Sequence, residues 1–108
     1  MTWHFMVRDG VNLRGRDIAE GPSLVFQHGL GGDEAQVAEV VPQQGLRRLT
    51  LECRGHGQSG AGPVEKFSIP QFAQDVLDFA DQRGIESFTV GGISMGSAWA
   101  NRRERQKN

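Results

Sequence analysis

A strand-like apolar segment runs directly into a serine flanked by glycines within residues 87–100, and this junction constrains the fold more than any other stretch. Residues 88–90 (FTV) have the aromatic and β-branched character of a buried strand. Residues 92–96 (GISMG) then follow the G-x-S-x-G pattern of a sharp turn from a strand into a helix. Glycines at both ends of that pattern remove Cβ clashes around the central residue. We therefore expect a sheet in which one strand ends at an exposed Ser94.

The G-x-S-x-G pattern alone is a weak signal in a chain with 15 glycines, so rival glycine motifs must be tested. Residues 91–97 have the spacing of a phosphate-binding P-loop, but Ser97 stands where that loop requires lysine. Residues 29–34 begin a dinucleotide-binding G-x-G-x-x-G pattern, but Glu34 stands in place of the third glycine. Both nucleotide motifs are incomplete, which leaves Ser94 as a candidate nucleophile.

Composition indicates one globular domain. The chain has 108 residues, of which 37% are hydrophobic and 23% charged. A net charge of -1 gives no electrostatic footprint for nucleic acid or an anionic membrane, although residues 101–108 are locally basic. We recognise no signal peptide and no membrane-spanning run, and expect a cytoplasmic location. Cys53 is the single cysteine and no Cys/His cluster has zinc spacing, so we expect no disulfide, metal or cofactor.

The first half of the chain alternates strand-forming segments with turn signals. Two such segments within residues 2–18 bracket Asp9-Gly10, a strong turn dipeptide, and predict a β-hairpin. Residues 23–27 predict the next strand, which is apolar and ends in a glycine-rich loop. Asp33 is expected to cap a short helix that runs through Val41.

The second half continues the alternation of strands, loops and helices. Residues 46–53 predict a strand with Leu49 and Leu51 on one face, and the glycine-set loop 54–60 ends it. A helix follows, and the junction within residues 87–100 supplies the last expected strand. An alternation of this kind is typical of an α/β fold with a largely parallel sheet.

The helix between these strands carries the clearest start and stop signals. Ser68 is expected to cap it in a capping box with Gln71, and Gly84 is expected to end it. Its apolar face has helical spacing and consists of Ile69, Phe72, Ala73, Val76, Leu77, Phe79 and Ala80. The residues expected to face water are Asp75, Asp78, Asp81 and Gln82.

Three landmarks in order make the chain resemble the N-terminal part of an α/β-hydrolase-fold enzyme. They are His28-Gly29 after the third strand, residues 54–59 (RGHGQS) after the fourth, and residues 92–96 after the fifth. The resemblance covers residues 1–100. It implies an α/β fold class: a partial α/β-hydrolase fold with an N-terminal β-hairpin followed by parallel strands and intervening helices. Residues 101–108 form a polar basic tail outside this portion.

The resemblance implies a serine hydrolase of the esterase or lactonase type. Ser94 matches the family's nucleophile, and the backbone N–H groups of Leu30 and Met95 match its oxyanion hole. His28 shapes the loop that holds Leu30, and the glycines that support the two loops are Gly29, Gly92 and Gly96. Serine at this place disfavours family members with a nucleophilic aspartate and favours acyl chemistry on a small-molecule ester, lactone or related substrate.

The residues after Ser94 depart from the family pattern. The family's acid and histidine follow its nucleophile, whereas here one acid, Glu104, and no histidine do so. The charged residues 101–108 stand where a buried helix would stay apolar, which we interpret as a truncated or frame-shifted end. His28 and His56 are the alternatives for a replacement base, although both belong to loop-shaping motifs.

Two functions stay open at this point. The first is a serine hydrolase whose catalytic set is incomplete in this chain, and the second is a non-catalytic fragment or half-domain retained for binding. In the family's sheet the strand of residues 87–93 has neighbours on both sides, and one of them would follow residue 108. An unpaired apolar edge is a template for pairing with another chain, so self-association through it is expected. Neither nucleic acid nor a membrane is an expected partner.

Overall fold

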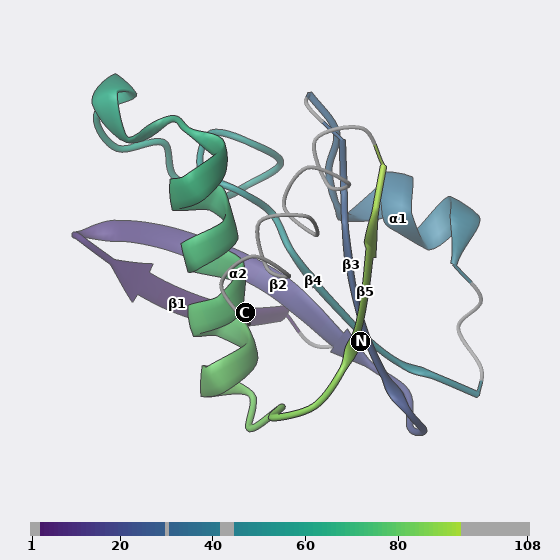
Figure 1. Ribbon diagram of the computed structural model, residues 1–108. Coiled ribbons are helices and arrows are strands. Elements are labelled where there is room, and N and C mark those ends of the chain that lie inside the picture. The colour runs from purple at the N-terminus through teal and green to yellow at the C-terminus, as the bar shows by residue number, and fades with distance from the viewer. Residues whose placement is uncertain (1–2, 30, 42–44, 94–108) are drawn as a thin grey trace.

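The structure, a computed structural model, describes residues 3–29, 31–41 and 45–93. Within these residues it contains one sheet in the order β1-β2-β4-β3-β5, with a helix on each face (Figure 1). This is the mixed α/β fold that the sequence predicts. In this part of the chain, no helix is both long enough and apolar enough to cross a membrane. The elements in chain order are β1 (Trp3–Arg8), β2 (Val11–Ile18), β3 (Ser23–Gln27), α1 (Glu34–Val40), β4 (Arg47–Leu51), the 3-10 helix η1 (Val64–Lys66), α2 (Ile69–Gln82) and β5 (Thr89–Gly92).

The predicted N-terminal hairpin is confirmed. Strands β1 and β2 pair antiparallel up to Arg8 opposite Val11. Asp9 and Gly10 connect them with φ angles of 52° and 76°, the positive values that a two-residue hairpin turn with the strands' own twist requires. Strand β2 then pairs antiparallel with β4, which joins the hairpin to the parallel part of the sheet.

Three parallel strands form the other half of the sheet. Strand β3 lies between β4 and β5, so that Val25 is opposite both Leu49 and Val90. The carboxyl ends of these three strands therefore lie along one edge of the sheet, where the loops that follow them meet. Strand β5 is shorter than the expected strand of residues 87–93 and is the last strand of the described sheet.

The two helices cover opposite faces because side chains alternate along β4. Leu49 and Leu51 belong to the hydrophobic core that includes the apolar side chains of α2. Arg48 points to the other face, where its Nη2 donates to Glu34 Oε1 of α1 over 2.7 Å. The segment after β3 thus leads into α1 on one face, and the segment after β4 leads into α2 on the other.

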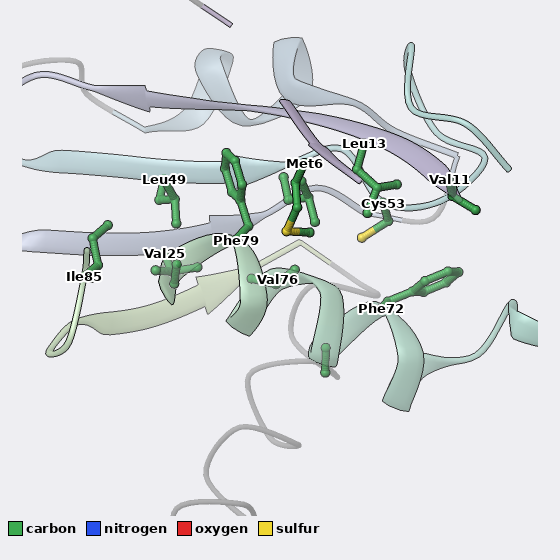
Figure 2. Packing of buried hydrophobic residues seen from close by; sticks show 13 residues of the cluster. Met6, Val11, Leu13, Val25, Leu49, Cys53, Phe72, Val76, Phe79 and Ile85 are labelled. Carbon is green, nitrogen blue, oxygen red and sulfur yellow. The ribbon is translucent and has the colours of Figure 1, made fainter. Parts of the chain in front are cut away.

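Apolar side chains of helix α2 pack against the sheet (Figure 2). The predicted face is buried at Phe72, Ala73, Val76, Phe79 and Ala80, whereas Ile69 and Leu77 are partly buried against the same cluster. Full burial of a valine or phenylalanine side chain contributes roughly 1.5–3 kcal/mol to the free energy of folding. The core lies between α2 and the β1, β2, β4 and β3 strands, and includes Met6, Val11, Leu13, Val25, Leu49, Leu51, Cys53 and Ile85.

The helix caps agree with the sequence in part. Asp33 Oδ1 accepts from the backbone N–H of Gln36 at the start of α1, and Ser68 Oγ accepts from the N–H of Gln71 at the start of α2. The expected capping box of α2 is wrong in its second half, because the Gln71 side chain donates to Asp75 Oδ1 over 2.9 Å instead. Gly84 follows the helix with a φ of 74°, as a C-terminal glycine does.

The prediction that Asp75 of α2 faces water is wrong. Its side chain is completely buried and pairs with the equally buried Arg54 from the loop after β4. Asp78 is largely covered and pairs with Arg8 of β1, whereas Asp81 and Gln82 are exposed as expected. The periodicity of apolar residues marks the core side of the helix, but it does not reveal a carboxylate that enters the core with a buried cation as its partner.

Candidate functional site

The expected site residues belong to the segments at the ends of two neighbouring strands, β3 and β5. Leu30, Ser94, Met95 and Gly96 lie outside the described residues. The residues that immediately precede the two gaps are described: Gly29 in the loop after β3, and Ile93 at the end of β5. The backbone N–H of Ile93 donates to the carbonyl of Gln27 over 3.0 Å, and Gly92 pairs with Gln27 in the sheet register. The ends of β3 and β5 therefore lie side by side.

Glycine at position 91 permits the close approach of these two strands. A Cβ atom added there would lie 2.8 Å from the ring of Phe26, on the neighbouring strand β3. Contacts that short are not made by real Cβ atoms, so a larger residue would push β5 away from β3 or displace the ring. The glycine before the G-x-S-x-G pattern thus has a packing role that the pattern itself does not specify.

His28 is buried at the end of β3 and is held by two backbone groups. Its Nε2 lies 3.0 Å from the N–H of Cys53, which can only donate, so Nε2 accepts. The proton is then on Nδ1, which donates to the carbonyl of Gly29 over 2.7 Å. Burial lowers the pKa of His28, against the opposing effect of the Gly29 bond. A neutral imidazole with both nitrogens engaged positions this loop and has no free lone pair for proton abstraction.

The loop after His28 is fastened to the start of α1. The N–H of Gly29 donates to Gln36 Oε1 over 2.7 Å, and the N–H of Gly32 donates to the carbonyl of Gly29 over 2.9 Å. A Cβ atom on Gly32 would collide with the same Gln36 amide. The glycine-rich loop is therefore shaped by a side chain of the helix that follows it.

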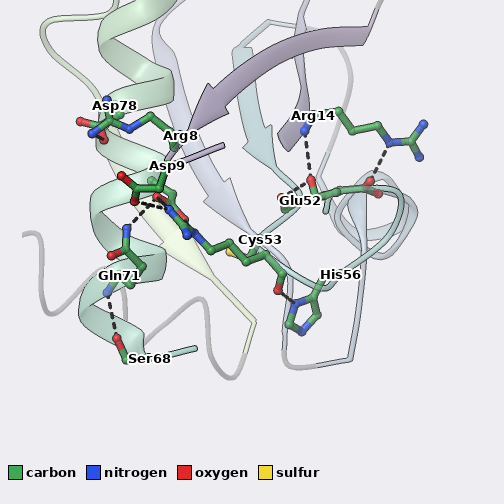
Figure 3. A network of polar contacts seen from close by, with 12 residues as sticks. Arg8, Asp9, Arg14, Glu52, Cys53, His56, Ser68, Gln71 and Asp78 are labelled. Atoms are coloured by element: carbon green, nitrogen blue, oxygen red, sulfur yellow. Dashed lines mark hydrogen bonds and ion pairs between the residues drawn. The ribbon is translucent and has the colours of Figure 1, made fainter. Parts of the chain in front are cut away.

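Glu52, directly after β4, accepts three hydrogen bonds through its carboxylate, and Figure 3 shows it beside Arg14, one of the donors. Its carboxylate accepts from Arg14 Nε at 2.7 Å, from the N–H of Gln58 at 2.9 Å and from the N–H of Glu34 at 3.1 Å. Burial alone would raise the pKa of Glu52, but these hydrogen bonds outweigh it and the pKa is lowered. Hydrogen bonds to a charged group contribute about 1.5–3 kcal/mol each. The ionised carboxylate thus joins β2, the loop after β4 and α1.

The loop of residues 54–60 folds around this carboxylate. Gly57 has a φ of 55°, and a Cβ atom there would collide with the Glu52 carboxylate. Ser59 Oγ donates to the Glu52 carbonyl over 2.6 Å and accepts from the N–H of Arg14 over 3.0 Å. Arg54 anchors the other side of the loop through Asp75, with bonds of 2.7 and 3.2 Å. The RGHGQS segment is therefore a tightly bonded support for the strand ends.

At the carboxyl end of the sheet, the Gln27 side chain bonds across from β3 to β4, and both its amide oxygen and its amide nitrogen have a partner. The β3–β4 register runs from Ser23 opposite Arg47 to Val25 opposite Leu49. Beyond it, the Gln27 amide replaces a backbone partner: Oε1 accepts from Leu51 N over 2.9 Å and Nε2 donates to Leu51 O over 2.7 Å. The two strands are thereby separated by the width of a side chain.

The other candidate side chains are structural in the described part of the chain. Cys53 is buried, and burial raises its pKa to about 12, so its thiol is protonated at neutral pH. His56 Nδ1 lies 3.0 Å from the carbonyl of Arg54, and its ring centre lies 4.8 Å from that of His28. Among the described residues, no three His, Cys, Asp or Glu side chains are grouped as a metal site would require.

Sequence reasoning missed the roles of Glu52 and Gln27. Both are polar residues at the ends of apolar strands, next to the glycine loops. A buried carboxylate or amide in such a place needs partners, and loops with many free N–H groups can supply them. Their position was the available signal, although the identity of the partners depends on tertiary structure.

Comparison with known proteins agrees with this architecture. The protein-family model described as alpha/beta hydrolase fold matches residues 22–102. The chain is 39% identical over 83 residues to 3-oxoadipate enol-lactonase 1 of Acinetobacter baylyi, and the aligned region covers 73% of this chain and 30% of the lactonase. It is 31% identical over 109 residues to thiohydrolase aneE of Aspergillus aculeatus, which covers 89% of this chain and 34% of the thiohydrolase. The chain thus spans about a third of the length of these curated relatives.

Solved structures show the same arrangement. A proline iminopeptidase-related protein of Thermus thermophilus matches with a TM-score of 0.86 and 25% identity, over 97% of this chain and 40% of that protein. The thioesterase domain from the curacin biosynthetic pathway matches with a TM-score of 0.83 and 21% identity, over 94% of this chain and 38% of that domain, and supports the fold alone. From the family-model match and the lactonase similarity together, the chain belongs to the α/β-hydrolase-fold family.

Proposed function

We propose that the chain carries the nucleophile and the oxyanion-binding loops of a serine hydrolase acting on a small-molecule ester, lactone or related acyl substrate. Ser94 Oγ gives up its proton and attacks the acyl carbon, the acyl C–O bond breaks as the leaving oxygen takes up that proton, and a covalent acyl intermediate results. Water then cleaves this intermediate, which releases the carboxylic acid and restores the serine. The N–H groups of Leu30 and Met95 donate to the carbonyl oxygen as it becomes negative. The supporting groups are His28 and the glycines of the two loops.

The observation that carries this proposal is the hydrogen bond from Ile93 N to Gln27 O. Ser94 directly follows Ile93 in the sequence. Leu30 comes two residues after His28, which directly follows the other bonded residue at the end of β3. In a parallel sheet, loops that leave adjacent strand ends share one edge, and ligands bind there. The segments that carry the proposed nucleophile and the proposed oxyanion donor therefore leave the sheet at the neighbouring ends of β5 and β3.

The names of the relatives favour an acyl substrate. One relative is named an enol-lactonase and another a thiohydrolase, and a lactone is a cyclic ester, which is cleaved at its acyl carbon. Relatives of this family with other chemistry exist, since an epoxide hydrolase of Sus scrofa is 25% identical over 97 residues. Serine at position 94 favours the acyl reaction over epoxide opening from a carboxylate nucleophile.

The base is the missing part of this proposal. His28 has both ring nitrogens bonded to backbone groups, and no histidine follows Ser94 in this sequence. We infer that the acid and the histidine come from residues outside these 108. Without them, a loss on the order of 10⁴-fold in rate relative to a complete serine hydrolase is expected. The alternative is a non-catalytic fragment retained at most for binding.

Ester hydrolysis with an added base tests the proposal. The purified chain, Ser94→Ala and the matched control Ser97→Ala are given an activated phenyl ester, with and without free imidazole to replace the absent base. We expect weak turnover that imidazole increases in the unaltered chain and in Ser97→Ala, and that is absent from Ser94→Ala. Equal rates in all three proteins would contradict the nucleophile assignment and favour the non-catalytic alternative. Rapid Ser94-dependent turnover without imidazole would show that His28 or His56 acts as the base.

A further inference from the structure

We propose that Glu52 is a positioning residue that fixes the far end of the loop carrying the oxyanion donor, an inference that rests on the function proposed for Leu30. The loop leaves β3 at His28 and ends at Glu34, the first residue of α1. Two adjacent residues at the end of β4 hold these two ends. Cys53 N donates to His28 Nε2 over 3.0 Å, and the Glu52 carboxylate accepts from Glu34 N over 3.1 Å.

The hydrogen bond at Glu34 is more than a helix cap. The first N–H groups of a helix have no acceptor within the helix, so an outside acceptor determines how its start is placed. A carboxylate at this end also interacts favourably with the helix dipole. Asp33 already caps the N–H of Gln36 from within the chain's own turn. Glu52 adds a bond from the end of β4, and together with the Arg48–Glu34 ion pair it fixes the start of α1 relative to the sheet.

The position of α1 is transmitted to the loop by one side chain. Gln36 of α1 accepts from the N–H of Gly29 over 2.7 Å, and the Gly29 carbonyl in turn accepts from Gly32 N over 2.9 Å. A shift of α1 away from Glu52 would therefore move or release the loop on both sides of residue 30. Because loss of a single oxyanion donor costs about 10²–10³-fold in rate, a small shift is enough to matter.

The charge of Glu52 is necessary because its carboxylate accepts from three donors. Oε1 receives Arg14 Nε and Gln58 N, and Oε2 receives Glu34 N. In Glu52→Gln, one oxygen becomes an NH₂ group, which cannot accept. If the remaining oxygen keeps Arg14 and Gln58, the NH₂ faces the N–H of Glu34, and donor is set against donor. The substitution preserves size and shape, and removes the bond to α1 selectively.

Amide hydrogen exchange tests this inference, and its first readout needs no variant. Glu34 and Ala35 are both in the first turn of α1, but only Glu34 N is bonded to Glu52. We expect the Glu34 amide to exchange roughly ten- to hundred-fold more slowly than the Ala35 amide, as a bond to a charged acceptor implies. Both rates are first divided by the intrinsic exchange rate that the neighbouring side chains set in an unfolded chain. Equal exchange at these two positions would overturn the inference.

The second readout compares Glu52→Gln with Asp17→Asn. Asp17 is a matched control because its carboxylate also binds arginine, here Arg47 and Arg83. We expect Glu52→Gln to speed exchange at Gly29 and Gly32 roughly tenfold more than at core amides of β4, and Asp17→Asn to affect all of them equally. Equal effects of the two variants on the loop, or an unchanged loop in Glu52→Gln, would contradict a positioning role.

The imidazole-assisted ester assay separates this inference from the proposed function. Glu52→Gln should lower the Ser94-dependent rate at saturating ester by roughly ten- to hundred-fold, while Asp17→Asn should keep it. An unaltered Ser94-dependent rate in Glu52→Gln would overturn the positioning role. If the unaltered chain has no Ser94-dependent rate, the proposed function fails, whereas the exchange at Glu34, Gly29 and Gly32 still decides whether Glu52 holds the loop.

Discussion

The buried pair of Arg54 and Asp75 provides the sharpest stability prediction. Both side chains are completely inaccessible to solvent. Arg54 Nε donates to Asp75 Oδ2 over 2.7 Å, and Arg54 Nη2 donates to Oδ1 over 3.2 Å. Asp9 also contacts Arg54 at 3.2 Å, but its side chain is 57% exposed. Asp75→Asn keeps the shape of the side chain and removes the charge that compensates Arg54.

The expected cost follows from the burial of this cation. Removing one partner of a buried ion pair costs about 3–5 kcal/mol, because the other charge stays buried without compensation. The exposed Asp9 offsets little of this, since pairs at the surface contribute about 0–1 kcal/mol. A domain of this kind has a total stability of about 5–15 kcal/mol. Asp75→Asn should therefore remove a large share of the free energy of unfolding.

Urea unfolding followed by circular dichroism at pH 7 measures this effect. With a denaturant slope of about 2 kcal/mol per molar, a loss of about 4 kcal/mol lowers the urea midpoint by about 2 M. Asp81→Asn is the matched control on the same helix, because Asp81 is exposed. Its effect should stay within about 0.5 kcal/mol.

A double substitution separates lost charge from lost packing. Arg54→Met combined with Asp75→Leu removes both charges and fills the space with apolar atoms. Replacement of a buried ion pair by apolar residues is often neutral or stabilising, so the double variant should recover most of the stability that Asp75→Asn loses. A loss below about 1 kcal/mol in Asp75→Asn would refute the reasoning, since an uncompensated buried guanidinium cannot be that inexpensive.

Two further predictions concern buried titratable groups. Because burial lowers the pKa of His28 below its ordinary value of 6.5, the unfolded chain binds more protons just below pH 6.5. Stability should therefore fall as the pH decreases through 6.5 toward the lowered pKa, and His28→Gln should lack that part of the slope in urea titrations at several pH values. Cys53, whose pKa is raised to about 12, should be unreactive toward a thiol reagent at pH 8 until urea unfolds the chain. Rapid native-state labelling would show instead that the strand end opens.

The elements of the fold could be predicted from the sequence because their signals are local. Asp9-Gly10 marks the hairpin, Ser68 and Gly84 bracket α2, and short apolar runs mark the strands. The water-facing prediction for Asp75 failed because its partner Arg54 is 21 residues away in the chain. Helical periodicity reports which side of a helix is apolar, and it cannot report a long-range ion pair within that side.

The hydrogen bonds that support the candidate site could not be predicted from the sequence. The order of the strand-end loops predicts where a site would form, and this position stays a prediction. The structure shows that the ends of β3 and β5 are neighbours. The bonds of Glu52 and Gln27 were not predicted, because their partners are distant in the chain. Glu52 bonds to residues of β2, of α1 and of the loop after β4, and Gln27 bonds to Leu51, which is 24 residues away. Self-association through the edge of β5 and the nature of residues 101–108 stay predictions.

Covalent capture of Ser94 tests the central claim most directly. A fluorophosphonate transfers its phosphonyl group to a serine oxygen with loss of fluoride, and peptide mass spectrometry then identifies the modified residue. The sequence contains five other serines, at positions 23, 59, 68, 87 and 97, which serve as internal controls. With free imidazole present, we predict modification of Ser94 and not of the other five. Modification spread over several serines, or an unmodified Ser94, would contradict the account of an acyl-transfer site at the carboxyl ends of β3, β4 and β5.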